Sequence, residues 1–88
     1  MTSPPKGVCF DKHGWEDYLS WQDDPKKRKR INQLIDHTLR TPFEGIGKPE
    51  PLKGDLQGFW SRRIDEEHRL VYCVEDEQLI VIQCRYHY

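Results

Sequence analysis

A glutamate between two prolines is the first side chain in the sequence that is suited to acid–base chemistry. Glu50 lies between Pro49 and Pro51, and Lys48 and Lys53 stand on either side of this turn. Prolines restrict the backbone, and neighbouring cations keep a carboxylate ionised, so this carboxylate would be held ready to act as a general base. The alternative is a solvent-facing glutamate in an ordinary turn.

The chain ends in a second group of chemically capable side chains, Arg85-Tyr86-His87-Tyr88. Histidine transfers protons readily near neutral pH, so His87 is a candidate general acid. Tyr88 could stack on a nucleobase or offer its phenol. The alternative is that these aromatic residues only cover the edge of a sheet.

Arginines form the third group, since arginine binds phosphate oxygens through two nitrogens and stays charged at any relevant pH. Four of them fall in or beside predicted strands: Arg62, Arg63, Arg69 and Arg85. We expect Arg63, Arg69 and Arg85 to converge on the open face of a sheet. The alternative is a solvated face on which these arginines pair with the acidic residues 65–67.

One glutamate, one histidine and several arginines together are the minimal set for cleaving RNA without a metal ion. The glutamate takes the proton of a ribose 2′-OH, an arginine stabilises the added charge on phosphorus, and the histidine protonates the leaving 5′ oxygen. No cluster of carboxylates and no close Cys/His spacing indicates a metal site. We therefore predict neither a metal ion nor a cofactor.

Two helices precede these residues. Asp11 can cap a helix over Lys12–Gln22, and Asp24 followed by Pro25 is a strong start signal for a second helix. The second helix ends near Arg40, and its apolar residues recur on one face: Ile31, Leu34, Ile35 and Leu39.

The sheet is built mainly from the second half of the chain. The segment Thr41–Gly58 is rich in proline and glycine and is predicted as a structured loop, long enough to be functional. Strands are predicted over Gly7–Phe10, Phe59–Ile64, Arg69–Glu75 and Gln78–Arg85, with a turn at Asp76 and Glu77. This order predicts one α+β domain over residues 1–88, with residues 1–6 as a loose leader. Two helices would pack on one face of a twisted, mainly antiparallel four-stranded sheet.

The net charge of −1 argues against a nucleic-acid-binding domain, but the charges are segregated along the chain. The first turns of the second helix contain a run of five cations, at a helix end where the dipole disfavours positive charge: Lys26, Lys27, Arg28, Lys29 and Arg30. We predict that this run follows the phosphates of a nucleic acid, with nuclear import as the weaker alternative.

The composition also predicts where in the cell the protein is found. No apolar run approaches the roughly 20 residues of a membrane helix, and the N-terminus lacks the apolar region of a signal peptide. The three cysteines lie in apolar stretches and are predicted as buried, reduced thiols: Cys9, Cys73 and Cys84. These features predict a cytoplasmic bacterial protein that does not bind membranes.

Several longer motifs resemble a known family: Thr41–Gly45, Gly47–Lys53, Gly58–Ile64, Glu66–Tyr72 and Arg85–Tyr88. The sequence that contains them is similar to the YoeB/Txe branch of the RelE-like toxins of bacterial toxin–antitoxin systems, from about Val8 to the last residue. The resemblance implies the RelE-like microbial RNase fold. It also implies a ribosome-dependent endoribonuclease that cuts mRNA in the ribosomal A site and so inhibits translation.

The resemblance further implies roles for individual residues. Glu50 matches the general base, His87 the general acid, and Arg69 the arginine that stabilises the transition state. Other matches are supporting residues around the scissile phosphate and its nucleotide: Lys53, Arg63 and Tyr88. We group three more basic residues with them as RNA-binding or supporting: Lys48, Arg62 and Arg85.

The partners that the family implies are an antitoxin, the ribosome and a second copy of the toxin. A YefM/Axe-type antitoxin would neutralise the toxin by covering or disturbing its C-terminal tail. The bacterial ribosome would present mRNA, and the basic run Lys26–Arg30 would face it. A homodimer or a toxin–antitoxin heterocomplex is expected, and operator DNA would be bound only through the antitoxin.

The alternative from a different class is a non-catalytic module that binds RNA or the ribosome and blocks translation by occupancy. It explains the arginines and the basic run, but it gives Glu50 and His87 no task. New mRNA 5′ ends at codon positions would favour the nuclease, whereas stalled ribosomes on intact mRNA would favour the binder.

Overall fold

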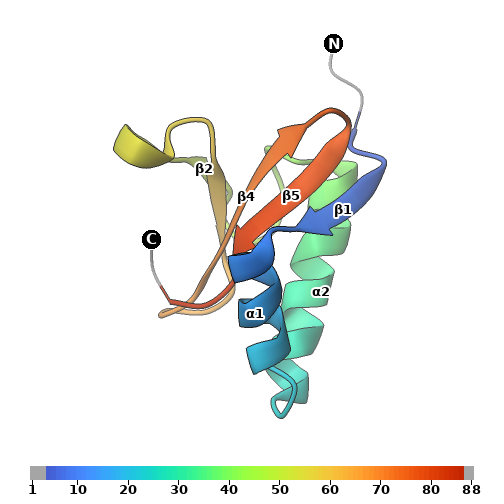
Figure 1. Ribbon diagram of the computed structural model, residues 1–88, viewed down its shortest axis with the longest axis vertical. Helices are drawn as coiled ribbons and strands as arrows, with labels where there is room; N and C mark the ends of the chain where they lie inside the picture. Colours follow the sequence, from blue (N-terminus) through green and yellow to red (C-terminus); the bar gives the residue numbers. More distant parts are fainter. Residues whose placement is uncertain (1–3, 87–88) are drawn as a thin grey trace.

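A computed structural model describes residues 4–86 of the chain, and residues 1–3 and 87–88 lie outside that description. Along the chain come β1 (Gly7–Phe10), α1 (Lys12–Ser20), α2 (Pro25–Arg40), β2 (Glu50–Pro51), the 3-10 turn η1 (Gly54–Leu56), β3 (Trp60–Arg63), β4 (Arg69–Glu75) and β5 (Gln78–Gln83). The strands form one sheet in the order β1-β5-β4-β3-β2, in which β1 and β5 are parallel and the other pairs are antiparallel (Figure 1).

The predicted α+β class is confirmed, but the count of four strands is wrong. The additional strand is β2, which lies inside the predicted loop Thr41–Gly58. A strand of two residues is too short to leave a period-two pattern in the sequence. It exists because β3 pairs with it, so that Glu50 lies opposite Ser61 and Pro51 opposite Trp60.

Both predicted helix starts are confirmed. The Asp11 carboxylate accepts a hydrogen bond from the Gly14 N–H at 2.7 Å, and the Asp24 carboxylate accepts one from the Lys27 N–H at 3.2 Å. These contacts satisfy backbone donors that have no partner within the helix. The first helix is shorter than expected and ends at Ser20. Neither helix in residues 4–86 is long and apolar enough to cross a membrane.

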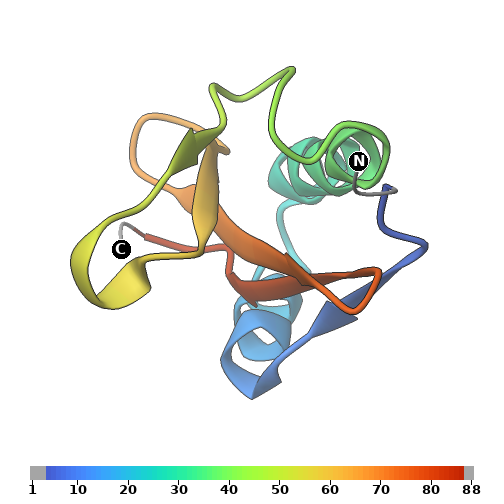
Figure 2. The same ribbon diagram turned by 90° about the horizontal axis from the view of Figure 1, so that it is seen from above.

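The two helices pack differently against the sheet. The buried side of α2 faces the apolar residues of β4 and β5 and forms the core with them, and it comprises Ile31, Leu34, Ile35 and Thr38. The shorter α1 lies at the end of β5 rather than along its length (Figures 1 and 2). A Cβ on Gly14 would come within 2.3 Å of the Val81 carbonyl oxygen, so a glycine is required for this close approach. The expected packing of both helices on one face therefore holds in full only for α2.

The structure changes the predicted bounds of the N-terminal leader and of the last strand, and it keeps the predicted hairpin turn. Residues 4–6 are not a loose leader, because Pro5 is buried and Lys6 donates its N–H to the Glu77 carbonyl at 2.7 Å. The predicted hairpin turn is confirmed, with positive φ at both Asp76 and Glu77, as two-residue hairpins require. Strand β5 ends at Gln83, before the predicted Arg85.

Of the three cysteines, only Cys84 is buried as predicted. Burial raises the pKa of its thiol to about 12, with Asp17 nearby adding to the effect, so this thiol stays protonated and inert. Cys73 is half-buried, and Cys9 is exposed because β1 is an edge strand.

Arg62 lies on the core face of β3, fully buried against the segment that joins α2 to β2. Its guanidinium donates to three carbonyl oxygens of that segment, those of Thr41, Glu44 and Ile46, with distances of 2.8 Å to Glu44 and 3.0 Å to Ile46. Its Nε donates to the Tyr72 hydroxyl at 3.2 Å, and that hydroxyl donates onward to the Pro42 carbonyl at 2.7 Å. One buried cation therefore satisfies the backbone of a segment without regular structure.

We expect Arg62→Met to lower the free energy of unfolding by about 3 kcal/mol or more, because it leaves several buried acceptors without donors. Urea unfolding at neutral pH measures this loss. Arg62→Lys should recover only part of it, since one ammonium cannot span the three carbonyls. The matched control is Arg63→Met on the neighbouring, exposed side chain, which should change stability by less than about 0.5 kcal/mol. Equal effects at the two positions would contradict this account.

The turn between β3 and β4 is organised by Asp65. Its carboxylate accepts the N–H groups of Glu67 at 2.8 Å and His68 at 2.7 Å, and it forms an ion pair with Lys27 of α2. Burial by itself would raise the pKa of this carboxyl, but the Lys27 ammonium and the two N–H donors outweigh it and lower the pKa to about 2. The turn is thereby fixed to the start of α2.

A carboxyl whose folded-state pKa is depressed stabilises the fold above its unfolded pKa and loses this contribution as pH falls through the folded value. For Asp65 the window runs from pH 3.8 down to about 2, and the contribution is about 2 kcal/mol at neutral pH. Asp65→Asn should therefore be less stable at pH 7 and should lose less stability than the parent between pH 4 and 2, as measured by thermal unfolding. Asp36→Asn, which removes an exposed pair with Arg40, should cost less than about 0.5 kcal/mol. A parallel pH dependence in Asp65→Asn and the parent would refute the role of Asp65.

Candidate active site

Glu50 lies on the short edge strand β2, and backbone hydrogen bonds to the β3 side fix the chain on both sides of it. The Gly47 carbonyl accepts the Arg63 N–H at 2.7 Å, and the Leu52 N–H donates to the Phe59 carbonyl at 2.9 Å. The segment around Glu50 therefore runs antiparallel to β3, and an exposed carboxylate projects from a fixed point of the sheet.

Strand pairing places Glu50 on the same face as two of the predicted arginines, since directly opposed residues project to one side of a sheet. One row of opposed residues crosses four strands: Glu50, Ser61, Val71 and Gln83. The neighbouring row pairs Arg63 with Arg69. Leu70 and Tyr72 alternate with Arg69 and Val71 along β4 and belong to the core. We call the other side of the sheet, to which Glu50, Arg63 and Arg69 project, the open face. In Figure 2 the η1 turn lies on the side of the sheet away from α2.

Arg69 is nearly buried on the open face, with 8% of its surface exposed. Its Nη1 donates to the carbonyl oxygens of Asp65 at 2.6 Å, His68 at 3.0 Å and Glu66 at 3.3 Å. All three contacts use one nitrogen of a group that has five N–H donors. The predicted transition-state arginine is therefore also a structural clamp on the β3–β4 turn.

Three of the predicted supporting cations are exposed: Lys48, Lys53 and Arg63. Lys48 has a positive φ of 50° and lies two residues before Glu50, and Lys53 precedes the η1 turn. All three lie on the segments that pair at this edge of the sheet, β2 with its flanking residues and β3. Positive charge is thus available in the neighbourhood of Glu50.

The chain leaves β5 and returns to the start of β4. The Arg69 N–H donates to the Tyr86 carbonyl at 3.1 Å, and the Tyr86 N–H donates to Nδ1 of His68 at 2.7 Å. The predicted general acid His87 and the predicted nucleotide-binding Tyr88 lie outside the described residues. The carbonyl that is covalently bonded to residue 87 is nevertheless fixed beside Arg69.

The structure contradicts one of the predicted RNA contacts, Arg62, and gives a second one, Arg85, partners within the protein. Arg62 and Arg63 are consecutive in a strand, so they project to opposite faces, and Arg62 lies wholly in the core. Arg85 lies beyond the end of β5, where its guanidinium stacks on the Trp21 ring at 4.3 Å and donates to the Ser20 hydroxyl at 2.8 Å. Of the three arginines expected to converge, only Arg63 and Arg69 share the open face.

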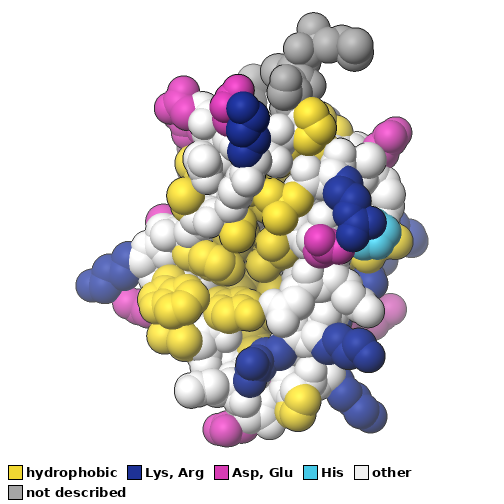
Figure 3. Space-filling model, turned by 90° about the vertical axis from the view of Figure 1, so that its right-hand side faces the viewer, with side chains coloured by type: hydrophobic (Ala, Val, Ile, Leu, Met, Phe, Trp, Pro, Cys, Tyr) yellow, Lys and Arg dark blue, Asp and Glu magenta, His cyan; other side chains and the backbone are white. Residues whose placement is uncertain are grey.

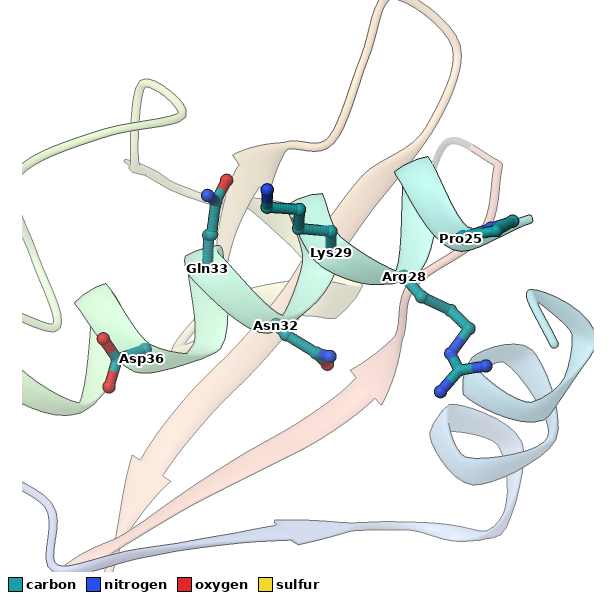
Figure 4. A pocket seen from close by; sticks show the side chains of 6 residues that line it. All are labelled: Pro25, Arg28, Lys29, Asn32, Gln33 and Asp36. Atoms are coloured by element: carbon teal, nitrogen blue, oxygen red, sulfur yellow. The ribbon is translucent and has the colours of Figure 1, made fainter.

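The basic run at the start of α2 does not form a single face. Lys27 pairs with Asp65, and Arg30 donates to the carbonyl oxygens of Arg63 and Ile64. In Figure 4 the Arg28 and Lys29 side chains leave the helix in different directions around a shallow hollow. The residues lining that hollow include none of the predicted catalytic groups: Pro25, Arg28, Lys29, Asn32, Gln33 and Asp36. The exposed members of the run that remain for contact with a partner are Lys26, Arg28 and Lys29.

An exposed apolar patch covers a different part of the surface, over β1, α1 and α2 (Figure 3). Its aromatic residues contact one another, with ring centroids 5.6 Å apart for Phe10 and Trp15 and 5.9 Å apart for Trp15 and Tyr18. Val8 and Trp15 are 38% and 48% exposed.

Within residues 4–86, no group of three or more His, Cys, Asp or Glu side chains is arranged to hold a metal ion. His68 lies within the fold rather than on its surface, since it is 7% exposed and accepts the Tyr86 N–H. Sequence reasoning missed the contacts that Asp17, Ser20 and Trp21 make with the C-terminal segment. These residues lie more than sixty positions away from it, and no local pattern marks them.

Several known proteins are similar to this chain in sequence and in fold. Residues 10–88 match the sequence model of the YoeB-like toxin of bacterial type II toxin-antitoxin systems. Toxin YoeB of Streptomyces coelicolor is 61% identical over 82 residues, covering 92% of this chain and 98% of that toxin. A YoeB–YefM complex from Staphylococcus aureus is similar in structure, with 46% identity, a TM-score of 0.84, and coverage of 92% of this chain and 95% of that one. A YoeB dimer from the same organism has 43% identity and a TM-score of 0.85, covering 98% of this chain and all of that one.

The match to the family spans nearly the whole chain and includes the segments that carry Glu50, Arg63, Arg69 and the C-terminal residues. On this similarity and on the shared α+β architecture, the chain belongs to the YoeB-like toxins of bacterial type II toxin–antitoxin systems.

Proposed function

We propose that this toxin is an endoribonuclease that cuts mRNA in the A site of the translating ribosome without a metal ion. Glu50 takes the proton of a ribose 2′-OH, and the freed oxygen attacks the adjacent phosphorus. The bond from phosphorus to the 5′ oxygen breaks, and His87 donates a proton to that leaving oxygen. Arg69 stabilises the charge that develops on the phosphate, and the products are a cyclic phosphate and a 5′ hydroxyl.

The observation that carries this proposal is the hydrogen bond from the Arg69 N–H to the Tyr86 carbonyl, at 3.1 Å. It brings the covalent attachment point of His87 to the strand that carries Arg69. The pairing of β2, β3 and β4 brings Glu50 to the same face of the sheet. A base, a cation and the segment that bears an acid thus reach one region from three distant parts of the chain.

Exposed cations support RNA binding at this region. We assign Lys48, Lys53 and Arg63 to contacts with phosphates on either side of the scissile bond, since all three are exposed near Glu50. Tyr88 stacks on the nucleotide in this proposal. Arg62 is excluded from the RNA-binding set because it is fully buried and all three nitrogens of its guanidinium group donate to partners within the protein. Arg69 donates through Nη1 alone, and the rest of its guanidinium is left for the phosphate in this proposal.

The ribosome supplies most of the substrate recognition in this proposal. Glu50 is exposed on an edge strand, and none of the three hollows found over the described surface is lined by Glu50, Arg63 or Arg69. We propose that the ribosome positions the mRNA and that the exposed Lys26, Arg28 and Lys29 contact ribosomal phosphates.

The antitoxin is the proposed protein partner that controls this activity. The Staphylococcus aureus relatives are described as a complex with YefM and as a dimer. We propose a YefM/Axe-type antitoxin, and a homodimer or a toxin–antitoxin heterocomplex, for this chain as well. Operator DNA is contacted only through the antitoxin in this scheme.

Glu50→Gln should lower the rate of mRNA cleavage by at least about 100-fold, because the amide keeps the shape of the side chain but cannot accept the 2′-OH proton. The measurement is single-turnover cleavage on programmed ribosomes, with the new 5′ ends mapped by primer extension. The fold should be unchanged, since Glu50 is exposed.

Glu44→Gln is the matched control, because this exposed carboxylate lies in the preceding loop and has no role in the site. It should cleave at the parental rate. If Glu50→Gln still arrests translation fully while mRNA stays intact, the toxin acts by occupancy and the nuclease proposal is wrong.

Removing residues 87 and 88 should abolish cleavage while leaving the unfolding midpoint nearly unchanged. The expected reason is that residues 84–86 have contacts of their own with the rest of the chain, which the truncation leaves in place. Thermal unfolding and the same ribosome assay measure the two effects. A truncated protein that cleaves at the parental rate would rule out the role of His87.

A further inference from the structure

The three residues that follow β5 are each fixed by a contact with another part of the chain. The Cys84 carbonyl accepts the Trp21 Nε1–H at 2.9 Å, and its N–H donates to Asp17 at 3.1 Å. The Arg85 guanidinium lies 4.3 Å from the centre of the Trp21 ring. Residues 84–86 are therefore held in place by tertiary contacts, not by a strand.

Tyr86 has a backbone conformation that is unfavourable for a side-chain-bearing residue, with a φ of 64°. Such a conformation persists only when the surrounding structure fixes it from more than one side. Both backbone polar groups of Tyr86 are fixed. Its N–H donates to His68 Nδ1 at 2.7 Å, and its carbonyl accepts the Arg69 N–H at 3.1 Å and the Gln83 side-chain amide at 3.3 Å. The carbonyl thus has two donors, whereas the N–H depends on His68, so loss of the bond to His68 would allow Tyr86 to relax toward negative φ.

His68 is held as a hydrogen-bond acceptor. It is buried, and its ring lies edge-on to Trp21 with the centroids 4.8 Å apart. Its Nε2 lies 3.3 Å from a carboxylate oxygen of Glu67, which favours the tautomer with hydrogen on Nε2. That tautomer leaves Nδ1 with the lone pair that the Tyr86 N–H requires.

We propose that His68 is a positioning residue for the catalytic end of the chain. It accepts the Tyr86 N–H, keeps Tyr86 in its left-handed conformation, and thereby orients the peptide bond that leads to His87. The expected effect on the cleavage rate rests on the proposed nuclease function. The effect of the His68–Tyr86 hydrogen bond on the conformation of Tyr86 does not depend on that function. His68 itself contacts neither RNA nor the reacting atoms in this scheme.

Variants at His68 can separate the acceptor atom from the bulk of the ring. The amide oxygen of His68→Asn can occupy the place of Nδ1, so this variant should cleave within about threefold of the parent. His68→Leu fills space without an acceptor and should slow single-turnover cleavage about tenfold at saturating toxin, with little change in the concentration for half-maximal rate. His68→Gln places its oxygen one bond farther out and should behave as His68→Leu.

A second readout is independent of cleavage. Hydrogen exchange of the Tyr86 amide, followed by NMR on the full chain, should be slow in the parent and in His68→Asn and about tenfold faster in His68→Leu and His68→Gln. Unfolding midpoints of all variants identify any that fail to fold. If the Leu variant does not fold, the comparison of His68→Asn with His68→Gln still tests the acceptor atom.

The outcomes separate the two proposals. Equal cleavage and equal Tyr86 exchange in the Asn, Gln and Leu variants would overturn the positioning role. Equal loss of cleavage in the Asn and Gln variants, without a difference in exchange, would overturn it as well. If the parent itself does not cleave mRNA, the nuclease proposal fails, and the exchange measurement alone decides whether His68 fixes Tyr86.

Discussion

The buried guanidinium of Arg62 is the interaction on which the arrangement of the site depends. It supplies donors to three carbonyl groups of the segment between α2 and β2 and to the hydroxyl of Tyr72. That segment contains prolines and glycines and has no helix or strand of its own to satisfy its backbone. Because Gly47 then bonds to β3, the fixed segment determines where β2 begins and where Glu50 projects. A charge in the core thus positions a charge on the surface.

Gly47 shows how closely this segment packs. It has a φ of 81°, and an added Cβ would come within 2.8 Å of a Leu34 methyl group and 3.2 Å of the Arg62 Cβ. The chain can therefore pass between α2 and β3 only at a residue without a side chain. The core face of the sheet and the edge strand on which Glu50 lies meet at this position.

The opposite end of the site is held by contacts with α1 and with the β3–β4 turn. Asp65 fixes this turn to Lys27, Arg69 clamps its carbonyl groups, and His68 and Arg69 together bind Tyr86. The proposed transition-state arginine therefore begins β4 directly after this turn, and the same region fixes the segment leading to the proposed acid. In our proposal the ribosome supplies the enclosure around the RNA.

The sequence by itself determined the α+β class, the two helix starts at Asp11 and Asp24 and the β4–β5 hairpin, since these follow from capping residues, periodicity and turn signals. It also predicted Glu50 and, through the family resemblance, Arg69 as site residues. It did not determine which arginines face solvent. The alternation of a strand separates Arg62 from Arg63, but which of the two is buried depends on the face that α2 covers. Nor could it reveal strand β2 or the contacts of Trp21 and His68 with the C-terminal segment, because those are made by residues far apart in the chain. Only the packed structure decides such contacts, since their partners become neighbours when the core forms.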